Sequence, residues 1–101
     1  MEKITITRHA DGAHVNGQRG EYHAHVTGSE HIGRLIWRDE DGRRHATSTQ
    51  VPPEIGGRGI AAKLVEALIQ DARAQGFKVV PACSYVARAF DKNPEWAHLK
   101  A

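Results

Sequence analysis

The chain contains a single cysteine, Cys83, with a tyrosine two residues later, Tyr85. A thiol can act as a nucleophile, and a thiol or a phenol can donate a proton to a leaving group. Cys83 follows an apolar run and precedes a helical pattern, a place where ligands of α/β units collect and the pKa of a thiol tends to fall. The alternatives are a buried core cysteine and an amphipathic packing tyrosine. The sequence leaves both alternatives open.

A second chemical feature is a glycine cluster, Gly56, Gly57 and Gly59, directly before an amphipathic stretch. Glycines that open a helix expose backbone N–H groups at the positive end of the helix dipole, which suits a phosphate-bearing ligand. They also suit a plain turn between a strand and a helix, because glycine tolerates positive φ. Three glycines before so regular a helix favour the anion-binding interpretation.

The stretch after the glycines is predicted to be a long helix. Its apolar residues recur at steps of three and four and form one stripe: Ile60, Leu64, Val65, Leu68, Ile69 and Ala72. Gly76 ends this helix, and residues 77–83 are typical of a short, buried parallel strand. A short helix over residues 85–92 follows, and Asn93-Pro94 stops it. In the tail beyond, we expect Trp96 and Leu99 to pack on the core.

The first half of the chain alternates between polar and apolar residues. The pattern predicts strands over residues 3–8, 21–27, 32–38 and 43–51, and Asp11-Gly12 and Asn16-Gly17 are turn signals. The predicted fold class is therefore α/β (α+β), with a largely antiparallel sheet, a central helix and a parallel strand that splays away. We expect one domain over residues 1–101.

Composition narrows the classes of protein. With 101 residues, of which 26% are charged and 40% hydrophobic, the chain is typical of one globular domain. The net charge is +2, and the lysines and arginines are scattered along the chain rather than clustered, so we expect no nucleic-acid partner. No stretch resembles a signal peptide or a membrane span, so we expect no membrane association and a cytoplasmic location. The single cysteine excludes an internal disulfide and fits a reducing compartment. The oligomeric state is left open.

The seven histidines raise the question of a metal site. His23 and His25 would point the same way from one strand, and His45 is expected on a neighbouring strand. No cysteine or carboxylate falls at metal-ligand spacing with them. We therefore expect exposed strand histidines and no metal.

Three phosphate-bearing ligands compete for the glycine turn. A nucleotide P-loop requires a lysine followed by serine or threonine, whereas Leu64 follows Lys63. The spacing Gly57-x-Gly59-x-x-Ala62 matches a dinucleotide fingerprint, but the next strand offers no acidic residue for the ribose, and the chain is too short for a doubly wound sheet. The third ligand is coenzyme A.

Four short motifs follow one another in the second half of the chain: Val51-Pro52, Arg58-Gly59, Pro81-Ala-Cys83-Ser-Tyr85-Val86 and Asn93-Pro94-Glu-Trp96. In the order and spacing of these motifs the chain resembles the GNAT-type N-acetyltransferases, in particular a short, single-domain branch of that superfamily. Gly59 and Ala61 match the last two landmarks of the family's pyrophosphate loop. The resemblance covers roughly residues 22–99.

The resemblance implies an acetyl-CoA-dependent N-acetyltransferase. Thr49 and Val51 are the expected contacts of the pantetheine. The pyrophosphate is expected at the turn and the helix start, formed by Gly56, Gly57, Arg58, Gly59, Ile60 and Ala61. Cys83 is expected near the thioester, and Asn93 is the expected contact from the tail. Asn93 also suits a helix-terminating turn. Cys83 and Tyr85 are the expected catalytic residues, either as proton donors after direct attack by the amine or, for Cys83, as an acetylated intermediate; the superfamily favours direct attack.

Two departures from the family pattern matter. Gly56 stands where the family prefers arginine or glutamine, and Ser48 stands where the short branch often has histidine. They keep a second class open, a non-catalytic module that binds CoA or acetyl-CoA. The acceptor is an amine, and the chain has no residues to spare for an enclosing N-terminal region, so an open cleft and a protein or peptide amine are favoured.

Overall fold

The computed structural model describes residues 3–10 and 18–101, and the predicted turns at Asp11-Gly12 and Asn16-Gly17 lie outside them. The elements follow the chain in this order: β1 (Ile4–Ala10), β2 (Arg19–Val26), β3 (Ile32–Glu40), β4 (Arg43–Gln50), the 3₁₀ helix η1 (Pro53–Ile55), α1 (Ile60–Gln75), β5 (Lys78–Val80), α2 (Ser84–Lys92) and the 3₁₀ helix η2 (Pro94–Leu99).

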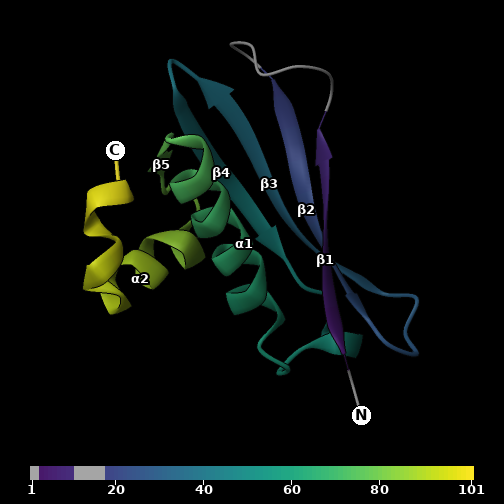
Figure 1. Ribbon diagram of the computed structural model, residues 1–101. Coiled ribbons are helices and arrows are strands. Elements are labelled where there is room, and N and C mark those ends of the chain that lie inside the picture. The colour runs from purple at the N-terminus through teal and green to yellow at the C-terminus, as the bar shows by residue number, and fades with distance from the viewer. Residues whose placement is uncertain (1–2, 11–17) are drawn as a thin grey trace.

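One five-stranded sheet has its strands in sequence order, β1-β2-β3-β4-β5. The pairs from β1 to β4 are antiparallel, and β5 pairs with β4 in parallel, as predicted. Both helices lie on one face of this sheet (Figure 1). The turn between β3 and β4 consists of Asp41 and Gly42, with φ of 53° and 73°. Two successive positive φ values are typical of a tight hairpin turn whose twist matches the strands.

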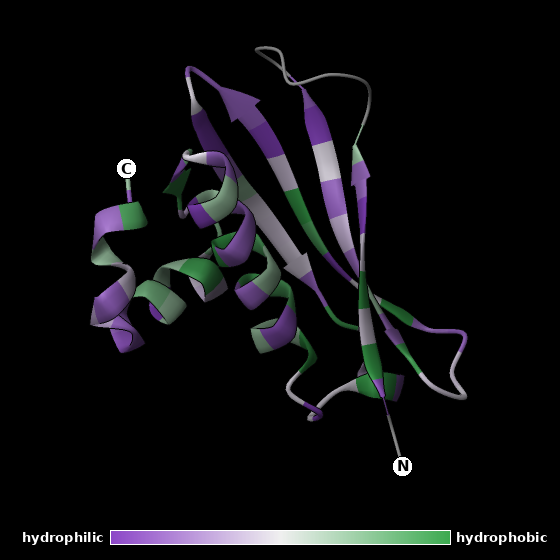
Figure 2. Cartoon of the chain, viewed as in Figure 1, coloured by the Kyte–Doolittle hydropathy of each residue, from purple (hydrophilic) through white to green (hydrophobic). Residues whose placement is uncertain are grey.

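The core lies between the sheet and α1. All six residues of the predicted apolar stripe on α1 are buried, as are Tyr22, Ala24 and Val26, which alternate along β2. Figure 2 shows the matching alternation of hydrophilic and hydrophobic residues along α1. Within the described residues, no helix is long and apolar enough to cross a membrane.

The strand after α1 is shorter than the sequence predicted. β5 covers Lys78–Val80 rather than residues 77–83, because Pro81 has no N–H to continue the ladder. The backbone N–H of Cys83 still donates to the carbonyl oxygen of Ala46 at 2.8 Å. On the other side of β5, Val79 pairs with Lys100, and the N–H of Ala101 donates to the Val79 carbonyl oxygen at 2.8 Å.

The tail packs on the core as predicted. Leu99 is buried, and Trp96 is partly buried against the core cluster. The ring of Trp96 meets the ring of Phe90 edge-on, with centroids 6.1 Å apart. The tail therefore anchors α2, the helix that begins directly after Cys83.

A charged side chain, Arg44, lies inside the sheet–helix layer and is only 2% exposed. Its Nε and Nη2 atoms donate to the two carboxylate oxygens of Asp39, at 2.8 and 3.0 Å, and its Nη1 donates to the Tyr22 hydroxyl at 2.9 Å. The guanidinium carbon lies 3.6 Å from the centre of the Trp37 ring. Buried charge is tolerated here because its donors are paired.

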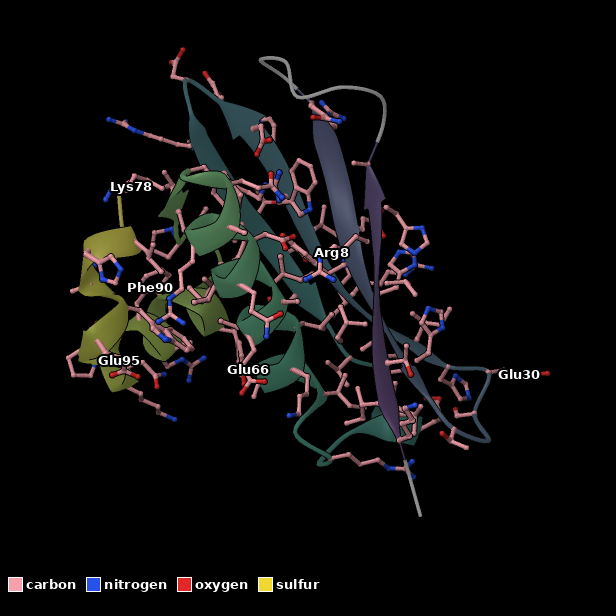
Figure 3. The ribbon with its side chains drawn as sticks, viewed as in Figure 1. Arg8, Glu30, Glu66, Lys78, Phe90 and Glu95 are labelled. Atoms are coloured by element: carbon pink, nitrogen blue, oxygen red, sulfur yellow. The ribbon has the colours of Figure 1, made fainter. Side chains whose placement is uncertain are left out.

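The hydrogen bonds continue from Tyr22 to α1. The Tyr22 hydroxyl donates to Asp71 at 2.8 Å, and burial, the largest contribution, raises the pKa of this tyrosine well above its ordinary value. Arg8 of β1 binds the same carboxylate at 2.9 Å, and Figure 3 shows Arg8 between the sheet and α1. Asp71, which lies outside the apolar stripe, therefore ties α1 to the sheet.

Candidate functional site

A β-bulge in β4 separates this strand into two parts. Trp37 of β3 pairs with Ala46 and Ile36 pairs with Ser48, so Thr47 is the extra residue. The parallel pairing with β5 covers only Arg43–His45 of β4, so the strand's second part extends past the end of β5. Bulges re-aim a strand and its side chains. The bulge lies where the predicted splay begins.

Cys83 and Thr49 meet at this separation. The Cys83 sulfur lies 3.4 Å from Oγ1 of Thr49, and the thiol is partly buried. Cys83 is also the residue that precedes the first turn of α2. The structure therefore brings together a predicted catalytic residue and a predicted coenzyme contact, from segments 34 residues apart in the chain.

The surroundings of Cys83 lower the pKa of its thiol. Partial burial alone raises that pKa, but hydrogen bonds to the Thr49 hydroxyl and to the backbone N–H groups of Val86 and Tyr85 outweigh it. The start of a helix stabilises a thiolate for the same reason, because its free N–H groups point at the sulfur. The Cys83 thiol therefore loses its proton more readily than the thiol of an ordinary cysteine does.

We expect alkylation of Cys83 by iodoacetamide to reach its half-maximal rate at a lower pH in the folded protein than in urea. The thiolate is the reactive form, so a lowered pKa moves the rise in rate toward lower pH. Thr49→Val should move it back up by removing the hydroxyl. Thr47→Val is the matched control, because that hydroxyl binds the Ile36 carbonyl oxygen instead. Equal midpoints for the folded and unfolded protein would contradict the prediction.

The glycine turn leads from η1 into α1 without a side-chain cap. Gly59 precedes the helix with φ of 72°, and no side chain of the described residues forms a capping hydrogen bond there. Gly57 also has positive φ, 74°. The N–H of Gly56 donates to the Pro53 carbonyl oxygen at 3.1 Å, so it is engaged within the turn. The donors best placed for a ligand are therefore those of the helix start, Ile60 and Ala61.

A groove of about 420 Å³ runs beside the first half of α1, between α1, α2 and η2. Tyr85, which is 37% exposed, and Asn93 both lie along it. The Asn93 side-chain nitrogen donates to the Ala89 carbonyl oxygen at 2.8 Å, so this residue ends α2 as well as lining the groove. Cys83, Thr49 and the glycines are outside the groove lining. Val51 lines a separate hollow with Pro52 at the end of β4.

Two cations on the groove were not predicted from the sequence. Arg88 and Lys92 lie four residues apart on α2 and line it together, opposite Glu66 of α1. Residues four apart share one face of a helix, so this spacing was the signal that could have revealed them. Phosphate groups of a bound ligand are a natural partner for such a pair.

These features define a mixed α/β fold with a bulged, partly separated sheet and a glycine turn at the start of α1. The sequence profile of the GCN5-related N-acetyl-transferase family matches residues 21–99. The chain therefore belongs to this family, which supports acyltransferase activity in general terms. A search of curated proteins gave no match.

Proposed function

We propose that the protein is an acetyl-CoA-dependent N-acetyltransferase that transfers the acetyl group directly to an amine. The observation that carries this proposal is the uncapped glycine turn at the start of α1, which lies within the family-matched segment. Acetyl-CoA supplies the acetyl group as a thioester, and members of the family typically use it.

The turn fits a diphosphate on geometric grounds. A Cβ atom added at Gly57 or Gly59 would meet no described atom within 4 Å, so the surface over these glycines is open. Backbone N–H groups of Arg58, Gly59, Ile60 and Ala61 would hold the negative charge. Arg88 and Lys92 across the groove add cations on the adjacent helix. The second part of β4, with Thr49, and Val51 directly after the strand would hold the pantetheine amides as a neighbouring strand would.

The roles of the chain's own residues follow from this placement. Backbone donors of β4 would stabilise the negative charge that develops on the carbonyl oxygen. Cys83 or Tyr85 would give a proton to the departing thiolate. Holding the acceptor amine and the thioester at attack distance supplies most of the rate. A protein or peptide amine is the proposed acceptor.

Gly59→Ala should weaken CoA binding about tenfold, a loss of about 1.4 kcal/mol in binding free energy, as measured by calorimetry. A methyl group at φ of 72° strains the turn and displaces the N–H donors that follow it. Gly76→Ala is the matched control, because Gly76 has φ of 79° at the other end of α1 and equally open surroundings. Both variants should lose about 1 kcal/mol of stability, whereas only the first should lose affinity.

The proposal itself is tested by thermal denaturation with added ligands. CoA and acetyl-CoA should raise the melting temperature, since they bind the folded state, while NAD and ATP should not. Equal effects of all four ligands, or no effect of CoA, would reject the proposal.

A non-catalytic acetyl-CoA-binding module is the second candidate. It is favoured by Ser48 in the place of the branch's histidine and by the engaged N–H of Gly56. Tight binding of acetyl-CoA without CoA release, across a panel of peptide and small amines, would support it over the enzyme.

A further inference from the structure

Three histidines meet on the β1–β2 surface that faces away from α1. His9 lies on β1, and His23 and His25 lie on β2. Side chains alternate between the faces of a strand, so the buried residues of β2 turn these histidines to the opposite face. One ring nitrogen of each lies within 4.8 Å of the others, among the described residues. His45 was expected on a strand next to that of His23 and His25, but it lies on β4, and β3 separates β4 from β2.

The ring nitrogens converge on one place. The Nε2 atoms of His9 and His25 lie 2.8 and 2.9 Å from the same atom, Oγ1 of Thr7. The rings of His9 and His23 are stacked, with centroids 4.1 Å apart. Two strands thus direct three imidazoles toward a common point, an arrangement that the alternation along β2 alone does not require.

A carboxylate supports the cluster. Oε1 of Glu21 lies 2.9 Å from Nε2 of His23. A carboxylate bound to one ring nitrogen fixes the tautomer and orientation of a metal-binding histidine and leaves the other nitrogen, Nδ1, for the ion. Glu21 lies two residues before His23 on the same strand and face, and it supports a ligand rather than being one.

We propose that His9, His23 and His25 bind one divalent transition-metal ion of the zinc type. Imidazole nitrogen is a ligand for zinc, copper and nickel rather than for magnesium or calcium. Zinc–nitrogen bonds of about 2.1 Å in a tetrahedral site place the nitrogens about 3.4 Å apart. His9 is exposed and the other two are partly exposed, so rotation of the side chains closes the remaining distance. The bound ion would cross-link β1 to β2.

Two cations oppose a metal ion at this site, Arg19 of β2 and Arg34 of β3, and both line the same hollow, of about 660 Å³, as Glu21 and His9. Arg34 also pairs with His23 across β2 and β3. Arg8 lines this hollow too, but its guanidinium binds Asp71 on the side of α1. Removal of the Arg34 charge would strengthen the binding of a cation and weaken the binding of an anion. A variant at Arg34 therefore distinguishes a metal site from an anion site.

Calorimetric titration of untagged, metal-stripped protein with zinc chloride tests the proposal. We expect one ion per chain, at least about tenfold weaker binding in His25→Ala and His9→Ala, and tighter binding in Arg34→Gln. His98→Ala, an exposed histidine of η2, should bind as the unchanged protein does. His25→Gln keeps a hydrogen-bonding group for Thr7 but removes the imidazole, so it should also lose zinc while melting normally.

The result that overturns the proposal is the absence of zinc binding, or zinc binding that neither His9→Ala nor His25→Ala weakens. Titration with inorganic phosphate covers the other occupant. If phosphate binds, zinc does not, and Arg34→Gln abolishes the phosphate signal, the hollow is an anion site and the metal assignment is wrong. These measurements do not involve the coenzyme and are independent of the proposed acetyl transfer.

Discussion

Cys83→Ala should lower the rate constant for acetyl transfer by about 100-fold or more while changing CoA affinity little. A positioned proton donor contributes roughly 10² to 10⁴ in rate, and the Cys83 thiol lies where β4 and β5 separate, beside Thr49. The coenzyme's binding energy is expected from the glycine turn instead. Release of CoA thiol, measured with the best acceptor of an amine panel, gives the rate, and calorimetry gives the affinity.

Tyr85→Phe identifies the proton donor. If Tyr85 rather than Cys83 serves the leaving thiolate, this variant loses the rate and Cys83→Ala keeps it. Mass measurement of the protein after incubation with acetyl-CoA alone tests the covalent route, since a stable acetyl group on Cys83 would contradict direct transfer. Full activity in both variants would contradict both catalytic assignments.

Arg44→Met should destabilise the fold by about 3 kcal/mol. Breaking a buried ion pair typically costs 3–5 kcal/mol because the remaining partner stays uncompensated, and Asp39 retains some solvent contact, with its side chain 19% exposed. The change also removes the hydrogen bond to Tyr22 and the contact with Trp37. Urea denaturation at neutral pH measures this loss as a fall in the transition midpoint.

Arg38→Met is the matched control for Arg44→Met. Arg38 forms a surface ion pair with Glu40, at 3.2 Å and with both side chains about half exposed, so its loss should change stability by less than about 0.5 kcal/mol. Equal decreases in the free energy of unfolding for the two variants would contradict the prediction, because they would show that the buried ion pair of Arg44 contributes no more than the surface pair of Arg38.

Features with a local cause could be predicted from the sequence. The long helix follows from its apolar stripe, and the antiparallel strands follow from the alternation of polar and apolar residues. These patterns depend on residues close together in the sequence, so they do not require knowledge of distant partners. The order of elements and the mixed sheet were confirmed for the same reason.

Features that depend on distant partners could not be predicted. The bulge at Thr47 arises from the register between β3 and β4, and nothing in the adjacent residues announces it. Arg44 is read from sequence as an ordinary polar strand residue, since its partners come from β2 and β3. The contact between Cys83 and Thr49 and the meeting of His9 with the β2 histidines likewise require the folded sheet.

The pairing of the last two residues with β5 has a consequence for self-association. Unpaired strand edges are templates on which another chain can add a strand and start aggregation. Here Lys100 and Ala101 occupy the outward side of β5, at Val79. A second molecule can pair with that edge at Val79 only after Lys100 and Ala101 have dissociated from β5.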